Sequence, residues 1–113
     1  MQRDDALLFD MLTHARLARR HVAAMTWEQF EVSALHQGAV IHALEVLGEA
    51  ARNVSQAFAD AHPEIPWRQM IGMRNALAHE YFRVDVRRIW ETVQNDLPAV
   101  MAAVEKLLPP LDE

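Results

Sequence analysis

The sequence contains no cysteine, only three glycines, and a single lysine among its eleven basic residues. Without cysteine the chain can form neither disulfides nor thiolate metal sites, which suits a reducing cytoplasm. No segment approaches the roughly 18 apolar residues in a row that a membrane-spanning helix needs. The N-terminus also lacks the basic and apolar regions of a signal peptide. We therefore expect a cytoplasmic protein that makes no membrane contact.

What the sequence does contain favours helices. Of its 113 residues 51% are hydrophobic, with alanine and leucine dominant, which is enough for one domain spanning residues 1–113. We expect an all-α fold, an antiparallel bundle of four main helices with a short linking helix and a kinked or split last helix. Apolar periodicity and capping residues place these elements at about 4–24, 26–30, 33–61, 66–79 and 85–108.

Local signals mark several helix ends. Thr26 and Gln29 have the spacing of a capping box, and Asp85 is a good N-cap for the last helix. Pro66 fits the first position of the helix it begins, and Pro98 is expected to kink or split the last helix because it has no N–H to donate. The helix over 33–61 is expected to be continuous, with an apolar seam at Val40, Leu44, Leu47, Ala51, Val54 and Phe58.

Positive charge is concentrated in one part of this acidic chain. The net charge is −5, which argues against a general nucleic-acid-binding protein. Residues 67–88 nevertheless hold five arginines against two acidic residues, a local charge of +3. The guanidinium group binds phosphate through a fork of donors. Four of these arginines are therefore candidate RNA-phosphate contacts: Arg68, Arg83, Arg87 and Arg88.

The same segment holds Arg74, Asn75, His79 and Tyr81 within eight residues. Histidine exchanges protons near neutral pH, arginine holds phosphate, and tyrosine offers a hydroxyl and a stacking surface. On a regular helix Arg74 and His79 would lie about 140° apart. Either the two residues have separate functions, or the helix finishes near His79 and a turn brings His79 and Tyr81 toward Arg74. We favour the turn.

Other chemistries find little support. The six histidines include no HExxH pair, so a metal site is not expected, and we expect no cofactor. No serine has a nucleophile-elbow context, and no glycine-rich phosphate loop is present. The spacing of Arg74 and His79 alone slightly favours a structural role, with His79 at a helix C-terminus and Arg74 in a surface ion pair. Two copies of the motif meeting across a two-fold axis would instead supply two histidines and two arginines around one phosphate.

Two further residues bear on this segment. Glu45 and Glu49 form an unfavourable like-charge pair unless a cation lies nearby. We therefore expect Arg74 or another arginine of the basic segment beside them, which makes Glu49 a candidate supporting residue. Gly72 lies mid-helix, either as tolerated variation or as the place where another helix approaches closely, including the same helix of a second subunit.

Three segments carry a resemblance to a known family. They are ALEVLGEAARNVS (43–55), HPEIPWRQMIGMRNALAHEYFRVD (62–85) and IWETVQNDLP (89–98). Together they resemble the HepT-like toxins of the HEPN superfamily, and RNALAHEY (74–81) matches the signature R-x-x-x-x-H-x-Y. The likeness covers most of the chain from about Gly38 onward, whereas the first 35 residues match only in being an amphipathic helix.

The resemblance implies a specific activity. Similar proteins are metal-independent ribonucleases that form homodimers through the motif helices, with a composite cleft at the interface. Arg74 and His79 would be catalytic, Asn75 would assist, and the RNA 2′-OH would attack the adjacent phosphate. A minimal nucleotidyltransferase antitoxin would silence the toxin by AMPylation of Tyr81. The expected partners are thus a second copy, RNA (tRNA or mRNA) and that antitoxin.

Two other functions stay open at this point. The chain could be a non-catalytic helical binding module that partners a minimal nucleotidyltransferase or binds its nucleotide, which the net charge of −5 would suit. A purely structural dimerisation domain is the third possibility, and the extent of the resemblance speaks against it.

Overall fold

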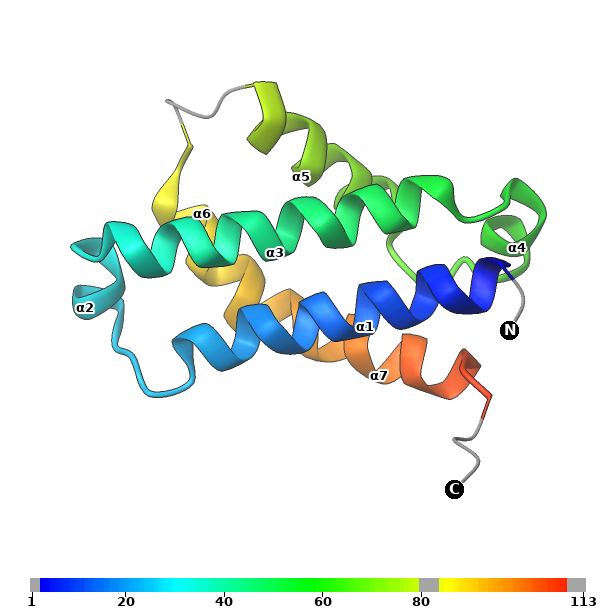
Figure 1. The fold of residues 1–113 in the computed structure, drawn as a ribbon, viewed down its shortest axis with the longest axis horizontal. Helices are drawn as coiled ribbons and strands as arrows, with labels where there is room; N and C mark the ends of the chain where they lie inside the picture. Colours follow the sequence, from blue (N-terminus) through cyan, green and yellow to red (C-terminus); the bar gives the residue numbers. More distant parts are fainter. Residues whose placement is uncertain (1–2, 80–83, 110–113) are drawn as a thin grey trace.

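The computed structural model describes residues 3–79 and 84–109, and these form helices joined by short connections (Figure 1). The elements in order are α1 (Arg3–Val22), α2 (Trp27–Glu31), α3 (Ala34–Asn53), α4 (Gln56–Ala61), α5 (Trp67–His79), α6 (Val86–Glu91), the π-helix η2 (Thr92–Asp96) and α7 (Leu97–Leu107). The expected all-α class is confirmed. Among the described helices none is both long and apolar enough to cross a membrane.

The two longest helices, α1 and α3, run antiparallel and side by side (Figure 1). Helix α7 packs on α1, while α5 lies on α3 and has only slight contacts with other described elements. Both long helices bury an apolar stripe at helical spacing. The buried residues are Leu8, Met11, Leu12, Ala15, Ala18 and Val22 of α1 and Val40, Ile41, Ala43, Leu44, Leu47, Ala50 and Ala51 of α3. Of the seam expected from the sequence, Val40, Leu44, Leu47, Ala51 and Val54 are buried, whereas Phe58 is half-buried.

The expectation of one continuous helix over 33–61 is wrong. Helix α3 ends at Asn53, Val54 has an extended conformation (ψ 141°), and Ser55 caps a separate helix α4 by accepting a hydrogen bond from the Phe58 N–H. The break is stabilised from a distance. Asp4 accepts hydrogen bonds from the Ser55 N–H at 2.9 Å and from the Ser55 hydroxyl at 2.6 Å. These contacts hold the start of α1 against the start of α4.

The local capping predictions are confirmed at two helix starts. Thr26 and Gln29 form both hydrogen bonds of a capping box, and the Asp85 carboxylate accepts from the N–H groups of Arg87 and Arg88. Pro66 lies one position earlier than expected, because its carbonyl accepts the first hydrogen bond of α5 from the Met70 N–H. Helix α1 also ends at Val22 rather than Ala24.

The expected break near Pro98 takes the form of a π-helix between α6 and α7. In a π-helix each carbonyl bonds the N–H five residues later, so the Val93 carbonyl would need the N–H that Pro98 lacks. The Arg19 guanidinium of α1 supplies it, donating at 3.1 Å to this carbonyl and at 3.1 Å to the Gln94 side chain. The break is therefore stabilised by a long-range contact.

Candidate active site

Helix α5 carries the described residues of the motif, and its orientation is fixed at one end and along one side. At its start the Trp67 indole N–H donates to the His62 carbonyl at 2.9 Å, and the Trp67 ring packs edge-on against Phe58. Along its length Met70 and Leu77 are buried where α5 packs on α3. Because these residues face α3, the opposite side of α5 faces outward.

Arg74 is held against α3. Its Nη2 lies 3.1 Å from the Oε2 of Glu49, and its Nη1 donates to the Asn75 side-chain oxygen at 3.0 Å. Only 25% of the Arg74 side chain is exposed, against 46% for Glu49. The prediction that an arginine of the basic segment lies beside Glu45 and Glu49 is therefore confirmed, and that arginine is Arg74.

Glu49 is itself surrounded by polar groups. The Asn53 amide donates to the Glu49 carbonyl at 2.8 Å and to its Oε1 at 3.2 Å, and Arg52 Nη1 lies 3.7 Å from Oε2. Oε2 is buried and has no partner with hydrogen-bond geometry among the described residues. Its interaction with Arg74 is nevertheless a close ion pair, because Oε2 lies 3.1 Å from Nη2, although the Glu49 side chain as a whole is half-exposed.

His79 does not approach Arg74 within the chain. It is the last residue of α5 and is exposed, still within the regular helix. The expected end of the helix near His79 is confirmed, because His79 is the last residue of α5. The further expectation that His79 swings toward Arg74 is wrong, because His79 keeps its place in the helix, about 140° from Arg74 around the axis. Tyr81, which was expected to take part in that turn, lies outside the described residues.

The outward side of α5 carries four exposed residues at steps of four, three and four: Arg68, Gly72, Asn75 and His79. We refer to these four as the outer stripe. On a helix such steps place residues along one line. A Cβ atom added at Gly72 would meet nothing within 4 Å, so no described part of the same chain approaches this glycine closely. The outer stripe therefore places Asn75 and His79 on one solvent-facing line, where the Asn75 side chain reaches Arg74 by a hydrogen bond and His79 lies away from the Arg74–Glu49 pair.

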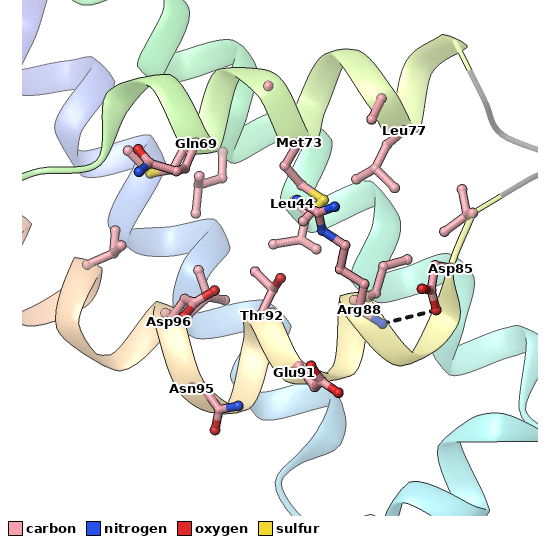
Figure 2. A pocket seen from close by; sticks show the side chains of 18 residues that line it. Leu44, Gln69, Met73, Leu77, Asp85, Arg88, Glu91, Thr92, Asn95 and Asp96 are labelled. Carbon is pink, nitrogen blue, oxygen red and sulfur yellow. Dashed lines mark hydrogen bonds between the residues drawn. The ribbon is translucent and has the colours of Figure 1, made fainter.

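Two hollows lie on different sides of α5. The smaller, of about 380 Å³, is lined by Arg74 and Glu49 together with Asp10, His42, Glu45 and Asn53, among others. The larger, of about 700 Å³, lies between α5 and the run from α6 to α7 and has Leu44, Met73 and Leu77 in its wall (Figure 2). Its size is typical of ligand sites. Neither hollow is lined by His79, and only the smaller one by Arg74, so we place the candidate site on α5 itself and not in the larger hollow.

The other predicted arginines are dispersed. Arg68 lies in the first turn of α5 and is exposed. Arg87 stands 4.6 Å above the Trp27 ring and bonds Glu91 at 3.2 Å. The Arg88 side chain extends from α6 across the larger hollow toward Met73 (Figure 2). Arg83 lies outside the described residues, so the described arginines do not form one continuous patch with Arg74.

Two residues of this site were not identified from the sequence: Gly48, which lies against Arg74, and Asn53, which bonds Glu49. A Cβ atom on Gly48 would overlap the Cβ of Arg74 and come within 2.8 Å of the Met70 carbonyl oxygen. A mid-helix glycine, one of only three in the chain, was an available signal for close approach. Among the described residues no group of three or more His, Asp or Glu side chains is arranged to hold a metal ion.

Comparisons with known proteins agree on one family. A family model described as "Ribonuclease HepT-like" matches residues 11–107. "Probable ribonuclease HepT" of Thermococcus cleftensis is 43% identical over 100 residues, covering 88% of this chain and 91% of the relative. "Putative RNase MJ1380" of Methanocaldococcus jannaschii is 35% identical over 88% of this chain and 92% of its own length. No solved structure gives a significant match.

Proposed function

Because the chain belongs to the ribonuclease HepT-like family, we propose that it is a metal-independent endoribonuclease toxin that cuts RNA at a site built by two subunits. Arg74 and His79 are its catalytic residues and Asn75 assists them. The observation that carries the proposal is their arrangement on α5. Arg74 is fixed beside Glu49, while Asn75 and His79 lie exposed on the outer stripe.

The reaction begins with attack of the RNA 2′-oxygen on the adjacent phosphorus. A bond forms between these two atoms, the bond from phosphorus to the 5′-oxygen breaks, and a cyclic phosphate remains. One histidine accepts the 2′-hydroxyl proton and another gives a proton to the leaving 5′-oxygen. The Arg74 guanidinium stabilises the negative charge that builds on the phosphoryl oxygens. The two proton transfers therefore need two histidines, and one chain supplies only one His79 at this site.

A homodimer supplies the second histidine. In one chain Arg74 and His79 diverge by about 140°, so a second copy is needed to bring both kinds of group to one phosphate. Gly72 at the middle of the outer stripe, open to at least 4 Å around its Cβ position, permits two α5 helices to approach closely across a two-fold axis. This supports the interpretation of Gly72 as an intersubunit contact.

Regulation by a minimal nucleotidyltransferase antitoxin completes the proposal. The modified residue is Tyr81, two positions beyond the end of α5. AMP would bring a negative phosphate and a bulky base to the place where an RNA phosphate must bind, and so would block it by repulsion and by volume. Tyr81 follows His79 in the family signature, which supports this assignment.

RNA binding in this proposal uses Arg68, Arg83, Arg87 and Arg88 as phosphate contacts, with tRNA or mRNA as substrate. Arg68 is the strongest of the described candidates, because it is exposed on the same outer stripe as His79. The protein acts as a single domain over residues 1–113, in the cytoplasm. The alternative, a non-catalytic module that binds a nucleotidyltransferase or its nucleotide, is favoured only by the net charge of −5.

The deciding experiment incubates purified protein with total RNA or tRNA in the presence of EDTA. We expect cleavage by the wild type and a loss on the order of 10²–10⁴-fold in Arg74→Ala and His79→Ala. Equal cleavage by wild type and His79→Ala, or a requirement for a divalent metal, would overturn the proposal. Loss of nucleotidyltransferase binding in these variants, with no ribonuclease activity in the wild type, would favour the binding module.

A further inference from the structure

Helices α3 and α5 approach each other closely at Arg74. A Cβ atom on Gly48 would overlap the Arg74 Cβ and lie 2.8 Å from the Met70 carbonyl oxygen. Both atoms belong to the body of α5 and not to the end of a flexible side chain, so neither can move aside without displacing the helix. At Gly38, which lies in the same helix α3, an added Cβ would meet nothing within 4 Å. The need for glycine is therefore specific to the point where α3 meets Arg74.

The residue after Gly48 completes this contact. Glu49 Oε2 is buried and lies 3.1 Å from Arg74 Nη2. The carboxylate is held in turn, because Asn53 donates to both the carbonyl and Oε1 of Glu49. A buried anionic oxygen is costly without a positive partner, so this oxygen favours the conformation in which the guanidinium stays in place.

We propose that Gly48 and Glu49 are positioning residues that act through Arg74, one fixing its backbone and the other its guanidinium. This inference rests on the proposed function, because it takes Arg74 to be the catalytic arginine. Gly48 lets α5 come close enough for the Arg74 Cβ to lie on α3. Glu49, with Asn53 behind it, then sets the direction of the side chain.

The arrangement leaves Arg74 able to bind phosphate. A guanidinium has five N–H donors, and the described contacts to Glu49 and Asn75 engage one nitrogen each, Nη2 and Nη1. A planar group fixed at two nitrogens presents its remaining donors in a defined direction, which lowers the entropy lost when the transition state forms. Misplacing such a group by about 1 Å can cost on the order of 10²-fold in rate.

The test compares kcat and KM for RNA cleavage, with thermal unfolding measured on every variant. Glu49→Gln keeps the shape of the side chain and removes its charge. We expect its kcat to fall on the order of 10²-fold while its unfolding midpoint stays near that of the wild type, because a half-exposed ion pair adds little stability. Glu49→Asp, which keeps the charge on a shorter side chain, should recover part of the lost kcat.

A matched control removes a comparable ion pair elsewhere. Glu105→Gln breaks the pair that Glu105 makes with Arg16 at 3.5 Å between α7 and α1, where 64% and 45% of the two side chains are exposed. We expect no change in kcat. For the glycine, Gly48→Ala should lower kcat and Gly38→Ala should not. If Gly48→Ala fails to fold, the glutamate series still decides the role of Glu49.

The outcomes separate this inference from the proposed function. If Arg74→Ala and His79→Ala are inactive while Glu49→Gln keeps the kcat of the wild type, Glu49 is not a positioning residue and the inference is wrong. If Arg74→Ala cleaves RNA as well as the wild type, the proposed function is wrong, and the inference that rests on it is wrong as well. A fall in activity of Glu49→Gln that exactly follows a loss of folded protein would also overturn the inference, because the effect would then be on stability alone.

Discussion

Arg74 and His79 lie five residues apart in the same helix, and their side chains leave it on faces about 140° apart. Arg74 is paired with Glu49 on α3, whereas His79 is exposed at the end of α5. The two groups that act on one phosphate in the proposed mechanism therefore do not meet within one chain. A second copy of α5 is the simplest way to bring them together, and this arrangement can be tested directly.

Mixing the wild type with His79→Ala provides the first test. The proposed mechanism uses one histidine from each subunit, so a dimer that contains one His79→Ala chain should be inactive. We expect the cleavage rate after subunit exchange to fall with the square of the wild-type fraction, because only wild-type dimers keep both histidines. The measurement is cleavage rate against the mixing ratio. A fall in simple proportion to the wild-type fraction, despite demonstrated exchange, would show that each chain cleaves RNA on its own.

A bulky side chain at Gly72 provides the second test. A Cβ atom at Gly72 meets nothing within 4 Å, and leucine replaces a poor helix former, so the isolated chain should be more stable by about 1 kcal/mol. We nevertheless expect the dimer to dissociate and cleavage to fall, because the leucine would prevent two α5 helices from approaching. Light scattering and activity measurements check this. Gly38→Leu is the control at another open glycine, and an active dimeric Gly72→Leu would refute the contact.

Salt dependence tests the role of Arg68. Each phosphate contact to single-stranded nucleic acid contributes about 0.7 to the slope of log K against log salt concentration. Arg68→Gln should therefore weaken RNA binding and reduce the slope by about that amount, with little change in kcat. Binding titrations on the inactive His79→Ala background measure it. Arg16→Gln, which removes an arginine paired with Glu105, should leave the slope unchanged; equal effects of both changes would argue against a specific contact.

Acid should weaken the link between the start of α1 and the start of α4. The Ser55 hydroxyl and N–H both donate to Asp4, and they hold the pKa of its carboxyl below the ordinary value of 3.8. The folded state thus binds the proton less readily than the unfolded chain. The stability that ionised Asp4 contributes is complete above the pKa that this carboxyl has in the unfolded chain. It disappears as the pH falls through the lower pKa of the folded state.

Thermal unfolding at a series of pH values measures this contribution. We expect Asp4→Asn to unfold at a lower temperature than the wild type near pH 7, and the difference to shrink below about pH 4. Asp5→Asn is the control, because Asp5 also lies in the first turn of α1 and shares the helix-dipole effect. A difference between wild type and Asp4→Asn that does not change with pH would contradict the prediction.

Local signals allowed much of the fold to be predicted. The Thr26–Gln29 capping box and the Asp85 cap depend on residues at most three positions apart, and the buried seam of α3 depends only on helical spacing. The break between α3 and α4 was missed because it depends on Asp4, 51 residues before Ser55. The hydrogen bond from Arg19 to the Val93 carbonyl, across 74 residues, is of the same kind.

The candidate site shows the same difference between features that local signals predict and features that depend on distant residues. The like-charge pair of Glu45 and Glu49 correctly indicated a nearby arginine, because unbalanced charge on one helix face needs a partner. The end of the helix near His79 was correctly predicted, but its side chain was expected to swing toward Arg74, and its position in the helix keeps the two about 140° apart. Gly48 was missed because its importance depends on which helix packs against it, and a single sequence does not give that information.

The way α5 is attached has a consequence for its motions. This helix rests mainly on α3, with Met70 and Leu77 as its buried side chains, and the larger hollow separates it from α6 and α7 (Figure 2). Lifting α5 would expose these few side chains and leave the packed pair of α1 and α3 intact. Its backbone amides should therefore exchange with solvent through a local opening of lower free energy than global unfolding. The helix that holds Arg74 would then be among the first parts of the molecule to open.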